Sequence, residues 1–553
     1  MNIVHYLLQK FFQEEKFKII TLIILSLTTV LIQTNLISLI TANIIEGIEK
    51  NNFANTMEYY KYFFGASVIF IIIYYTYKTI QNITVSKMMQ WIKHEIFKVI
   101  LLINNENMCH VNFVEFITPI TRISVSCYIL FYDILSVIMP FSAFLIMISL
   151  FFLYKNIAFG SLFLVGNVTI ILYAMYFWKD MSDFKTRQED KINKNEQYLV
   201  DVLNNIDKVI YRGQVRNEID IFSNKTDESI SLSNDFSFYV TKHIMVMTLI
   251  IYVIIFGSLF YLIHLRFSKK ISTTIFISFF TILLLYRDKI QNTINNIPDY
   301  LEFIGRLDYV VGTFNTMLGD KTNIPELLEK SYAPITLDFD RIQFKNVTFR
   351  YNKTNKLVLE NFNVDLEIKN KIVGITGLSG KGKSSFVKLI LRLYDPTSGE
   401  ILIDGQNINA IDPIYLRKNI TYVNQNSKLF DKKIIDNILY GCNDPSECNK
   451  HLDEILKNAK IKELFKNLDI RTTGAGSLGE NLSGGQRQVI NMINGFINPS
   501  EILILDEPTN ALDPELKKNV LQMIKYFKQY KKSVIIITHD RDVFPLFDEN
   551  VQI

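Results

Sequence analysis

Gly377-Leu378-Ser379-Gly380-Lys381-Gly382-Lys383-Ser384 is the stretch that decides the fold of the second half of this 553-residue chain. An apolar run, 371–376, precedes it as a predicted buried strand, and 386–393 follows with helical spacing. Strand, G-x-x-x-x-G-K-S loop and helix form the context that a phosphate-binding loop requires. Loop N–H groups and the helix N-terminus bind phosphate oxygens, while the lysine reaches the outer phosphates and the serine holds Mg²⁺. We predict an ATP site here, with these nucleotide-binding residues: Gly377, Ser379, Gly380, Lys381, Gly382, Lys383, Ser384 and Ser385.

Three further apolar segments after this loop are predicted strands, and each ends in polar residues. These are Gln425 after 420–423, Asp506 and Glu507 after 502–505, and His539 after 534–538. Ligands bind at the carboxyl ends of the strands in an open parallel sheet. Ser384, Gln425 and Asp506 supply oxygens suited to Mg²⁺, and Glu507 can orient or deprotonate water. We expect these residues to complete the ATP site.

The stretch Leu482-Ser483-Gly484-Gly485-Gln486-Arg487-Gln488 predicts a second anion-binding helix N-terminus. One ATP site already has its phosphate loop, so a second phosphate-binding terminus favours a nucleotide bound between two facing copies. In that arrangement Ser483, Gly485 and Gln486 bind the nucleotide from the opposite copy. Tyr351 follows a predicted strand and is a candidate for stacking on adenine.

The first 320 residues have the composition of a membrane domain. Aromatic residues make up 13% of the chain, and its mean hydropathy is +0.16. Six apolar runs, nearly free of charge, approach the roughly 20 residues that cross a bilayer. They are 19–45, 63–77, 128–154, 157–178, 243–265 and 272–286. Net charge is only +4, which gives no indication of a nucleic-acid partner.

Loop lengths predict the orientation. The long loops 78–126 and 179–242 hold most of the Lys and Arg residues of the first 320, which places them on the cytoplasmic side, or its matrix equivalent. An even number of spans puts the C-terminal half on that side too. Apolar residues in 179–224 recur with helical spacing, so this loop is either a solvated charged helix or an arm that carries motion to the ATPase. We expect a transmembrane domain over 1–320, a polar linker over 321–340 and an ATPase domain over 341–553.

The chain has four cysteines: Cys109, Cys127, Cys442 and Cys448. Because none of them has metal-ligand spacing with histidine, we expect free thiols in a reducing compartment.

Residues 341–553 resemble an ABC transporter nucleotide-binding domain, and the whole chain resembles an exporter-type half-transporter. The resemblance rests on the Leu482–Gln488 stretch together with the Gly377–Ser384 loop and the apolar strand that ends in Asp506 and Glu507. It implies an all-α six-helix transmembrane domain followed by an α/β P-loop ATPase domain. It also implies the following roles: Tyr351 stacks on adenine, Gln425 is the Q-loop glutamine, Glu507 the catalytic glutamate, His539 the switch histidine, and Asn510 to Asp513 the D-loop.

Within exporters, a few positions are similar to the mitochondrial subgroup: Trp178, Asp201, Leu203, Asn205, Val209 and Tyr211. The chain departs from the family at Gly476 to Gly479, where a Gly-Glu-Arg-Gly loop is usual, and at Val489 and Asn494, where arginines are usual. It also stops soon after His539, without the family's C-terminal helices.

The resemblance implies ATP-driven export by a dimer of half-transporters, either a homodimer or a pair with a similar chain. The substrate class stays open among lipids, peptides, drug-like amphiphiles and thiol compounds. An ATP-gated channel or regulator on the same scaffold is the alternative function, and a soluble ABC ATPase is a third, which the six spans oppose. Polar residues in the spans, such as Gln33, Thr34, Asn35 and Asn167, either contact an amphiphilic substrate or only pack one span against another. Arg287 and Lys289, beyond the last span, are candidates for contact with its charged headgroup.

Overall fold

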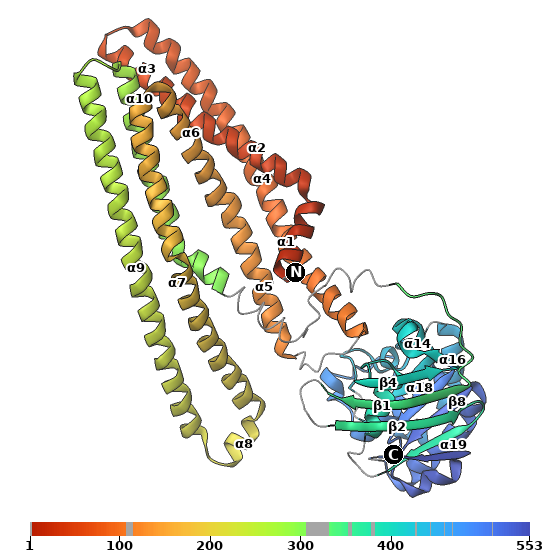
Figure 1. The fold of residues 1–553 in the computed structure, drawn as a ribbon. Helices are drawn as coiled ribbons and strands as arrows, with labels where there is room; N and C mark the ends of the chain where they lie inside the picture. Colours follow the sequence, from red (N-terminus) through yellow and green to blue (C-terminus); the bar gives the residue numbers. More distant parts are fainter. Residues whose placement is uncertain are drawn as a thin grey trace. The chain divides into compact units, whose positions relative to one another are not determined.

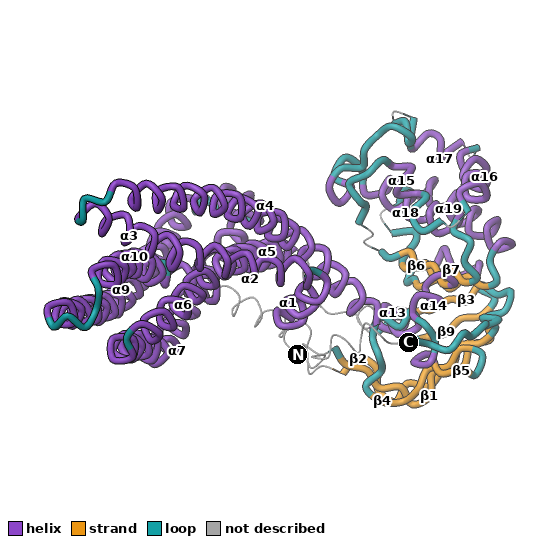
Figure 2. Tube along the Cα trace, turned by 90° about the horizontal axis from the view of Figure 1, so that it is seen from above, coloured by secondary structure: helices purple, strands orange, loops and turns teal. Residues whose placement is uncertain are grey.

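A computed structural model describes residues 3–106, 114–305, 331–351, 357–377, 382–425, 428–442, 444–457, 459–466, 468–510 and 512–553 (Figures 1 and 2). The chain forms two compact units. The first comprises Met1–Lys98 and Val111–Ile324, and the second Val99–His110 and Pro325–Ile553. Of the predicted linker, 321–330 lies outside the described residues, and 331–340 has no regular secondary structure.

The first unit is helical. Its elements are α1 (Ile3–Glu14), α2 (Lys16–Leu31), the π-helical η1 (Ile32–Leu36), α3 (Ile37–Glu49), α4 (Phe53–Glu106, whose end belongs to the second unit), α5 (Val114–Asp133), the π-helical η2 (Ile134–Ile138), α6 (Met139–Lys155), α7 (Ile157–Asn204), α8 (Ile206–Tyr211), α9 (Val215–Phe267) and α10 (Thr273–Asn295). The helices α7 and α9 run side by side, and α8 lies at the turn between them (Figure 1).

Five helical stretches of the described chain are long and apolar enough to cross a membrane. They are Lys16–Glu49, Phe53–Asn105, Ser124–Lys155, Ile157–Asn204 and Val215–Phe267. The sixth predicted span lies in α10, which is not among them because the charged residues 287–289 fall within its length. Since α4, α7 and α9 have 54, 48 and 53 residues, they are far longer than the roughly 20 residues of one crossing. The helical structure predicted from the spacing in 179–224 is confirmed, because α7, α8 and α9 cover almost all of this segment.

Aromatic packing holds the apolar end of this bundle together. The Phe152 ring centroid lies 4.9 Å from that of Phe159, 5.1 Å from Phe163 and 4.6 Å from Phe279. The chain reverses between α6 and α7 at Asn156, whose side chain accepts the Phe159 N–H at 2.9 Å and caps α7. Burying these rings brings α6, α7 and α10 together.

The charged halves of α7 and α9 are joined by buried polar side chains. Lys185 is 5% exposed and forms an ion pair with Glu189 at 3.2 Å. Gln188 Nε2 donates to Ser233 Oγ on α9 at 2.6 Å, and Asn195 Nδ2 donates to Ser229 Oγ at 2.6 Å. The polar composition of this segment therefore reflects specific pairing between the two helices and not a merely solvated surface.

The second unit contains two sheets. The antiparallel sheet has the order β2-β1-β4-β5, formed by β1 (Arg341–Arg350), β2 (Leu357–Glu367), β4 (Ser398–Ile403) and β5 (Gln406–Asn407). The parallel sheet has the order β6-β7-β8-β3-β9, formed by β3 (Ile372–Thr376), β6 (Ile420–Val423), β7 (Ile502–Asp506), β8 (Ser533–Ile537) and β9 (Glu549–Gln552). Every residue of β3, β7 and β8 is buried, as continuous apolar runs in a parallel sheet require.

The helices of this unit pack on both sides of the parallel strands (Figure 2). They are α13 (Lys383–Ile390), α14 (Pro413–Asn419), α15 (Ile434–Ile438), α16 (Pro445–Leu456), α17 (Ala459–Leu464), α18 (Gly484–Ile497) and α19 (Pro514–Phe527), with single turns η3 (Ile408–Ala410), η4 (Ser477–Gly479), η5 (Lys528–Tyr530) and η6 (Arg541–Leu546). The predicted helical transmembrane region and α/β ATPase fold are confirmed.

The expectation of free thiols is wrong for two of the four cysteines. Cys442 and Cys448 form a disulfide, with Cα atoms 6.7 Å apart. Asp444 caps α16 by accepting the Ser446 N–H at 2.9 Å, and this turn brings the two cysteines together. Cys127 is free and buried, and Cys109 lies outside the described residues.

Candidate nucleotide site

The predicted phosphate loop joins β3 to α13. Gly377 has φ +149°, and a Cβ at this position would lie 2.1 Å from the Ile553 carbonyl oxygen, so only glycine fits. Gly382 precedes α13 with φ +103°. Lys383 is 8% exposed, and its Nζ donates to the Gly377 carbonyl at 2.8 Å. The predicted loop residues Ser379, Gly380 and Lys381 lie outside the described residues.

Asp506, the last residue of β7, accepts two hydroxyl hydrogen bonds on the same oxygen. Ser384 Oγ on α13 donates to Asp506 Oδ2 at 3.3 Å, and Tyr422 OH on β6 donates to it at 2.9 Å. Burial raises the pKa of the Asp506 carboxyl, while the donated hydrogen bonds and the Lys383 charge act in the opposite direction. Burial also raises the pKa of Tyr422, so its hydroxyl stays protonated.

Glu507 follows in the left-handed conformation, with φ +51°. Its Oε1 lies 2.7 Å from His539 Nδ1, and its Oε2 accepts a hydrogen bond from Thr538 Oγ1 at 3.2 Å. Gln488 Nε2 donates to the Glu507 main-chain carbonyl at 2.9 Å. The carboxylate therefore has one defined orientation at the end of the strand.

Tyr351 and Gln425, two further residues predicted for the site, have no hydrogen bond to Asp506 or Glu507 among the described contacts. Tyr351 OH lies 2.8 Å from Ser385 Oγ at the start of α13, and its ring packs edge-on against Tyr394, with centroids 5.3 Å apart. Gln425 is exposed in the turn that follows β6. The structure thus joins Tyr351 to the phosphate-loop helix and leaves the Gln425 side chain in solvent.

The residues of the Leu482–Gln488 stretch contact their own helix. Ser483 Oγ accepts the Gln486 N–H at 3.2 Å, and Gln486 Oε1 accepts the Ser483 N–H at 2.9 Å. This reciprocal capping box begins α18 and explains the S-x-x-Q spacing locally. Asp513 likewise caps α19 by accepting the Leu516 N–H at 3.0 Å. Gly485 lies in the first turn of α18.

The departures from the family pattern have defined structures. Leu478 replaces a usual loop arginine and has φ +56° with its side chain 55% exposed. Asn494 on α18 donates to the carbonyl of Ile438 at 2.7 Å and to that of Tyr440 at 2.8 Å. Asn494 therefore attaches α18 to the segment after α15.

Three residues of this site were not singled out from the sequence: Tyr422, Gln488 and Thr538. Thr538 stands directly before His539, so its place at a strand end was the available signal. Gln488 follows the glycine pair on α18. From the sequence Tyr422 is predictable only as a strand residue, because its hydroxyl meets Asp506 only once β6 pairs with β7.

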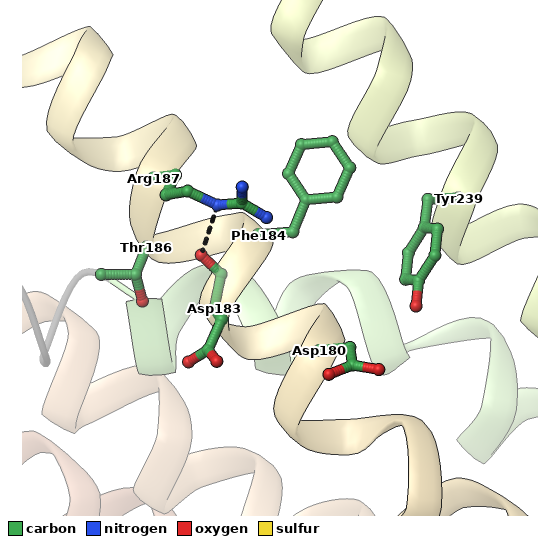
Figure 3. A pocket seen from close by; sticks show the side chains of 6 residues that line it. All are labelled: Asp180, Asp183, Phe184, Thr186, Arg187 and Tyr239. Atoms are coloured by element: carbon green, nitrogen blue, oxygen red, sulfur yellow. Dashed lines mark hydrogen bonds between the residues drawn. The ribbon is translucent and has the colours of Figure 1, made fainter.

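The helical unit has a cavity of about 740 Å³ between α7 and α9 (Figure 3). Tyr239 comes from α9, and the remaining lining residues come from α7: Asp180, Asp183, Phe184, Thr186 and Arg187. The Arg187 guanidinium carbon lies 5.3 Å from the Phe184 ring centroid. The described lining residues thus include carboxylate, guanidinium and aromatic side chains.

The polar residues that the sequence offered for substrate contact are mostly engaged within the bundle. Asn167 is buried and accepts a hydrogen bond from Tyr286 OH at 2.8 Å. Thr34 is buried and donates to the Val30 carbonyl at 2.8 Å. Arg287 pairs with its neighbour Asp288 at 2.9 Å. The Asn35 side chain lies outside the described residues.

Comparison with known proteins finds a family match in each half of the chain. Residues 359–510 match the family described as ABC transporter, and residues 17–288 match the ABC transporter transmembrane region. The alpha-hemolysin translocation ATP-binding protein HlyB of Proteus vulgaris is 37% identical over 232 residues, which is 41% of this chain and 32% of that protein. The ATP-dependent lipid A-core flippase of Pasteurella multocida is 39% identical over 215 residues, which is 38% of this chain and 35% of that protein. Each match thus spans about a third of the relative's length.

A solved structure of a bacterial Atm1-family ABC exporter with ATP bound superposes with a TM-score of 0.79 at 19% identity. It covers 98% of this chain and 93% of the exporter chain, so the two share their fold along almost the whole length. Two family matches, in the order transmembrane region and then ABC transporter ATPase, account for the helical unit and the α/β unit together: this chain belongs to the ABC transporter family.

Proposed function

We propose that the chain couples hydrolysis of Mg·ATP to export of a substrate across a membrane, as one half of a dimer. The observation that carries this proposal is the convergence of Lys383, Ser384, Asp506, Glu507 and His539 on one edge of the parallel sheet. The same chain has helices long enough to cross a bilayer. A phosphate site and a membrane bundle in one polypeptide support ATP-driven transport.

The site suits Mg²⁺ as well as nucleotide. Ser384 Oγ and Asp506 Oδ2 are hard oxygen donors 3.3 Å apart, the ligand type that Mg²⁺ prefers. Because burial disfavours the Asp506 carboxylate, a nearby cation would stabilise its charged form. The metal would be held by Ser384 and Asp506, and also by Gln425 once its side chain turns toward the site. When bound, the metal neutralises phosphate charge. Lys383 and the loop N–H groups would bind the phosphates.

Glu507 is the residue that would act on the attacking water. Its carboxylate is held by Thr538 and His539, so it can accept a proton or orient water without first reorganising. The His539 side chain is 72% exposed, whereas that of Glu507 is 10% exposed. His539 can therefore contact an incoming phosphate while it holds the buried carboxylate.

The second copy would complete each site. Ser483, Gly485 and Gln486 lie at the N-terminus of the 14-residue helix α18, a position that favours anions. The Ser483 oxygen accepts the Gln486 N–H, so its own O–H can still donate to a partner's phosphate, whereas the Gln486 amide donates to the Leu464 carbonyl at 3.0 Å. Asp513 would position the facing loop, as the family resemblance implies.

For the whole chain we keep a transmembrane domain over 1–320, a linker over 321–340 and an ATPase domain over 341–553 on the cytoplasmic or matrix-equivalent side. The substrate class stays open among lipids, peptides, drug-like amphiphiles and thiol compounds, and of these we propose an amphiphile. The cavity between α7 and α9, which offers charged and aromatic groups together, supports an amphiphile (Figure 3).

The test uses the full chain in lipid vesicles and the variant Glu507→Gln. The variant should bind ATP normally but hydrolyse it about 10²-fold or more slowly, because the base is lost while the phosphate ligands stay. Export requires turnover, so it should stop as well. Wild-type hydrolysis by Glu507→Gln would contradict the assigned role. Substrate flux that persists in the ATP-bound variant would favour the alternative, an ATP-gated channel.

A further inference from the structure

Tyr422 places a phenolic hydroxyl on β6, next to the end of β7. It lies on β6, opposite Ile504 of β7, and both strands are joined by main-chain pairing from Ile420 to Val423. Its OH passes beyond the end of that pairing and donates to Asp506 Oδ2 at 2.9 Å. The pairing of the strands does not require a hydroxyl here, because a phenylalanine would fill the same space.

The hydroxyl of Tyr422 differs from the other donor to this carboxylate. Ser384 Oγ also donates to Asp506 Oδ2, at 3.3 Å, but Ser384 is itself a proposed ligand of the metal. A serine oxygen that turns to a cation gives up its hydrogen bond to the carboxylate. Tyr422 can keep its hydrogen bond in both states, since nothing in the proposed metal site requires its oxygen.

We propose that Tyr422 is a positioning residue for the metal: its hydroxyl fixes the orientation of the Asp506 carboxylate, so that the carboxylate's remaining lone pairs face Mg²⁺ or a water bound to it. The proposal rests on the proposed function, in which Asp506 and Ser384 hold the metal. Hydrogen bonds from outside the ligand set orient ligating carboxylates in this way, and removing one typically costs 10–100-fold in metal affinity or activity.

The contribution of the metal to nucleotide binding separates this role from a structural one. The Kd of a fluorescent ATP analogue is measured on the full chain in lipid nanodiscs, in the Glu507→Gln background, once in EDTA and once in Mg²⁺. The Kd in EDTA divided by the Kd in Mg²⁺ measures how much the metal strengthens nucleotide binding, and this quotient is called the ratio below. Tyr422→Phe should leave the Kd in EDTA unchanged and reduce the ratio about tenfold. Saturation with Mn²⁺, followed by its electron paramagnetic resonance signal, should need a correspondingly higher concentration.

Tyr415→Phe is the matched control. The Tyr415 hydroxyl accepts the Leu337 N–H at 3.0 Å, in the same unit but outside the metal site. The same loss of one phenolic oxygen should leave the ratio unchanged. Should Tyr422→Phe fail to fold, as judged by thermal unfolding, Tyr422→Leu removes the hydroxyl in a second way and carries the same expectation.

The outcomes are distinct. An unchanged ratio in Tyr422→Phe, or an equal loss of affinity in EDTA and in Mg²⁺, overturns the positioning role. Ser384→Ala and Asp506→Asn are measured in parallel, and both should reduce the ratio more strongly than Tyr422→Phe. If neither changes it, the proposed metal site itself is wrong, and the failure lies with the proposed function and not with Tyr422 alone.

Discussion

Glu507 Oε1 lies 2.7 Å from His539 Nδ1, and this contact joins the ends of the neighbouring strands β7 and β8. One partner is buried and the other is largely exposed. The pair therefore connects the inside of the sheet to the surface from which a nucleotide would arrive. A change at His539 should act on Glu507 directly.

We expect His539→Ala to lower kcat for ATP by about 10²-fold while the Kd for ATP changes little, because the glutamate loses the partner that orients it. The double variant Glu507→Gln/His539→Ala should be no slower than Glu507→Gln alone, since groups that act as a unit are not additive. Steady-state hydrolysis rates of the four proteins test this. If the fold-reduction in hydrolysis rate of the double variant equals the product of the two single reductions, the two residues act independently.

Ser483→Arg should abolish ATP hydrolysis, because a long cation at the N-terminus of α18 would clash with the γ-phosphate bound by the facing copy. Ser483→Ala is the control, since it removes the N-cap at a cost of about 1 kcal/mol but adds no bulk. Hydrolysis and thermal unfolding are measured for both variants. A silent Ser483→Arg variant, together with normal hydrolysis by isolated monomers, would exclude shared sites.

Substrate-stimulated hydrolysis should identify the groups that meet an amphiphile. Asp183→Asn and Tyr239→Phe alter the cavity between α7 and α9, and Arg287→Ala alters the end of α10. Stimulation by the true substrate should require a several-fold higher concentration in at least one of these variants, while basal hydrolysis stays normal. Gln33→Leu tests the polar group in the first span. Unchanged stimulation in all four variants would place the substrate site elsewhere.

Lys531 makes stability depend on pH. Burial lowers its pKa from 10.5 to about 8, and its Nζ lies 3.3 Å from Ser500 Oγ. Between about pH 8 and pH 10.5 the unfolded chain binds this proton more often than the folded chain, so the free energy of unfolding rises with pH. Below pH 8 the folded protein carries the charged ammonium group, and the full free-energy penalty for burying that charge is present. The penalty is at most about 3 kcal/mol.

Lys531→Met should remove this dependence. From pH 7 to pH 10 the melting temperature of the wild type should rise relative to that of the variant, because other titrating groups are common to both proteins and cancel in the difference. Thermal unfolding of the full chain at several pH values measures it. A difference that stays constant over this range would show that Lys531 is not charged at a cost in the folded protein.

The sequence alone predicted the strand and helix on either side of the glycine-rich loop, the polar residues at the strand ends and most of the long apolar helices. These follow from local patterns, because glycine spacing, continuous apolar runs and charge-free stretches of about 20 residues each restrict the backbone without help from distant residues. Glu507 and His539 could be placed at strand ends from the sequence, because each lies two residues beyond an apolar run.

Only the tertiary structure decided which side chains meet. The strand order β6-β7-β8-β3-β9 places Tyr422 beside Asp506, 84 positions away in the chain, and Thr538 beside Glu507. The turn at Asp444 brings Cys442 to Cys448, which a search for metal-ligand spacing could not reveal. Such contacts depend on the register between strands and on the geometry of a turn. A hydrogen bond from a buried hydroxyl is therefore visible only once the strands are paired.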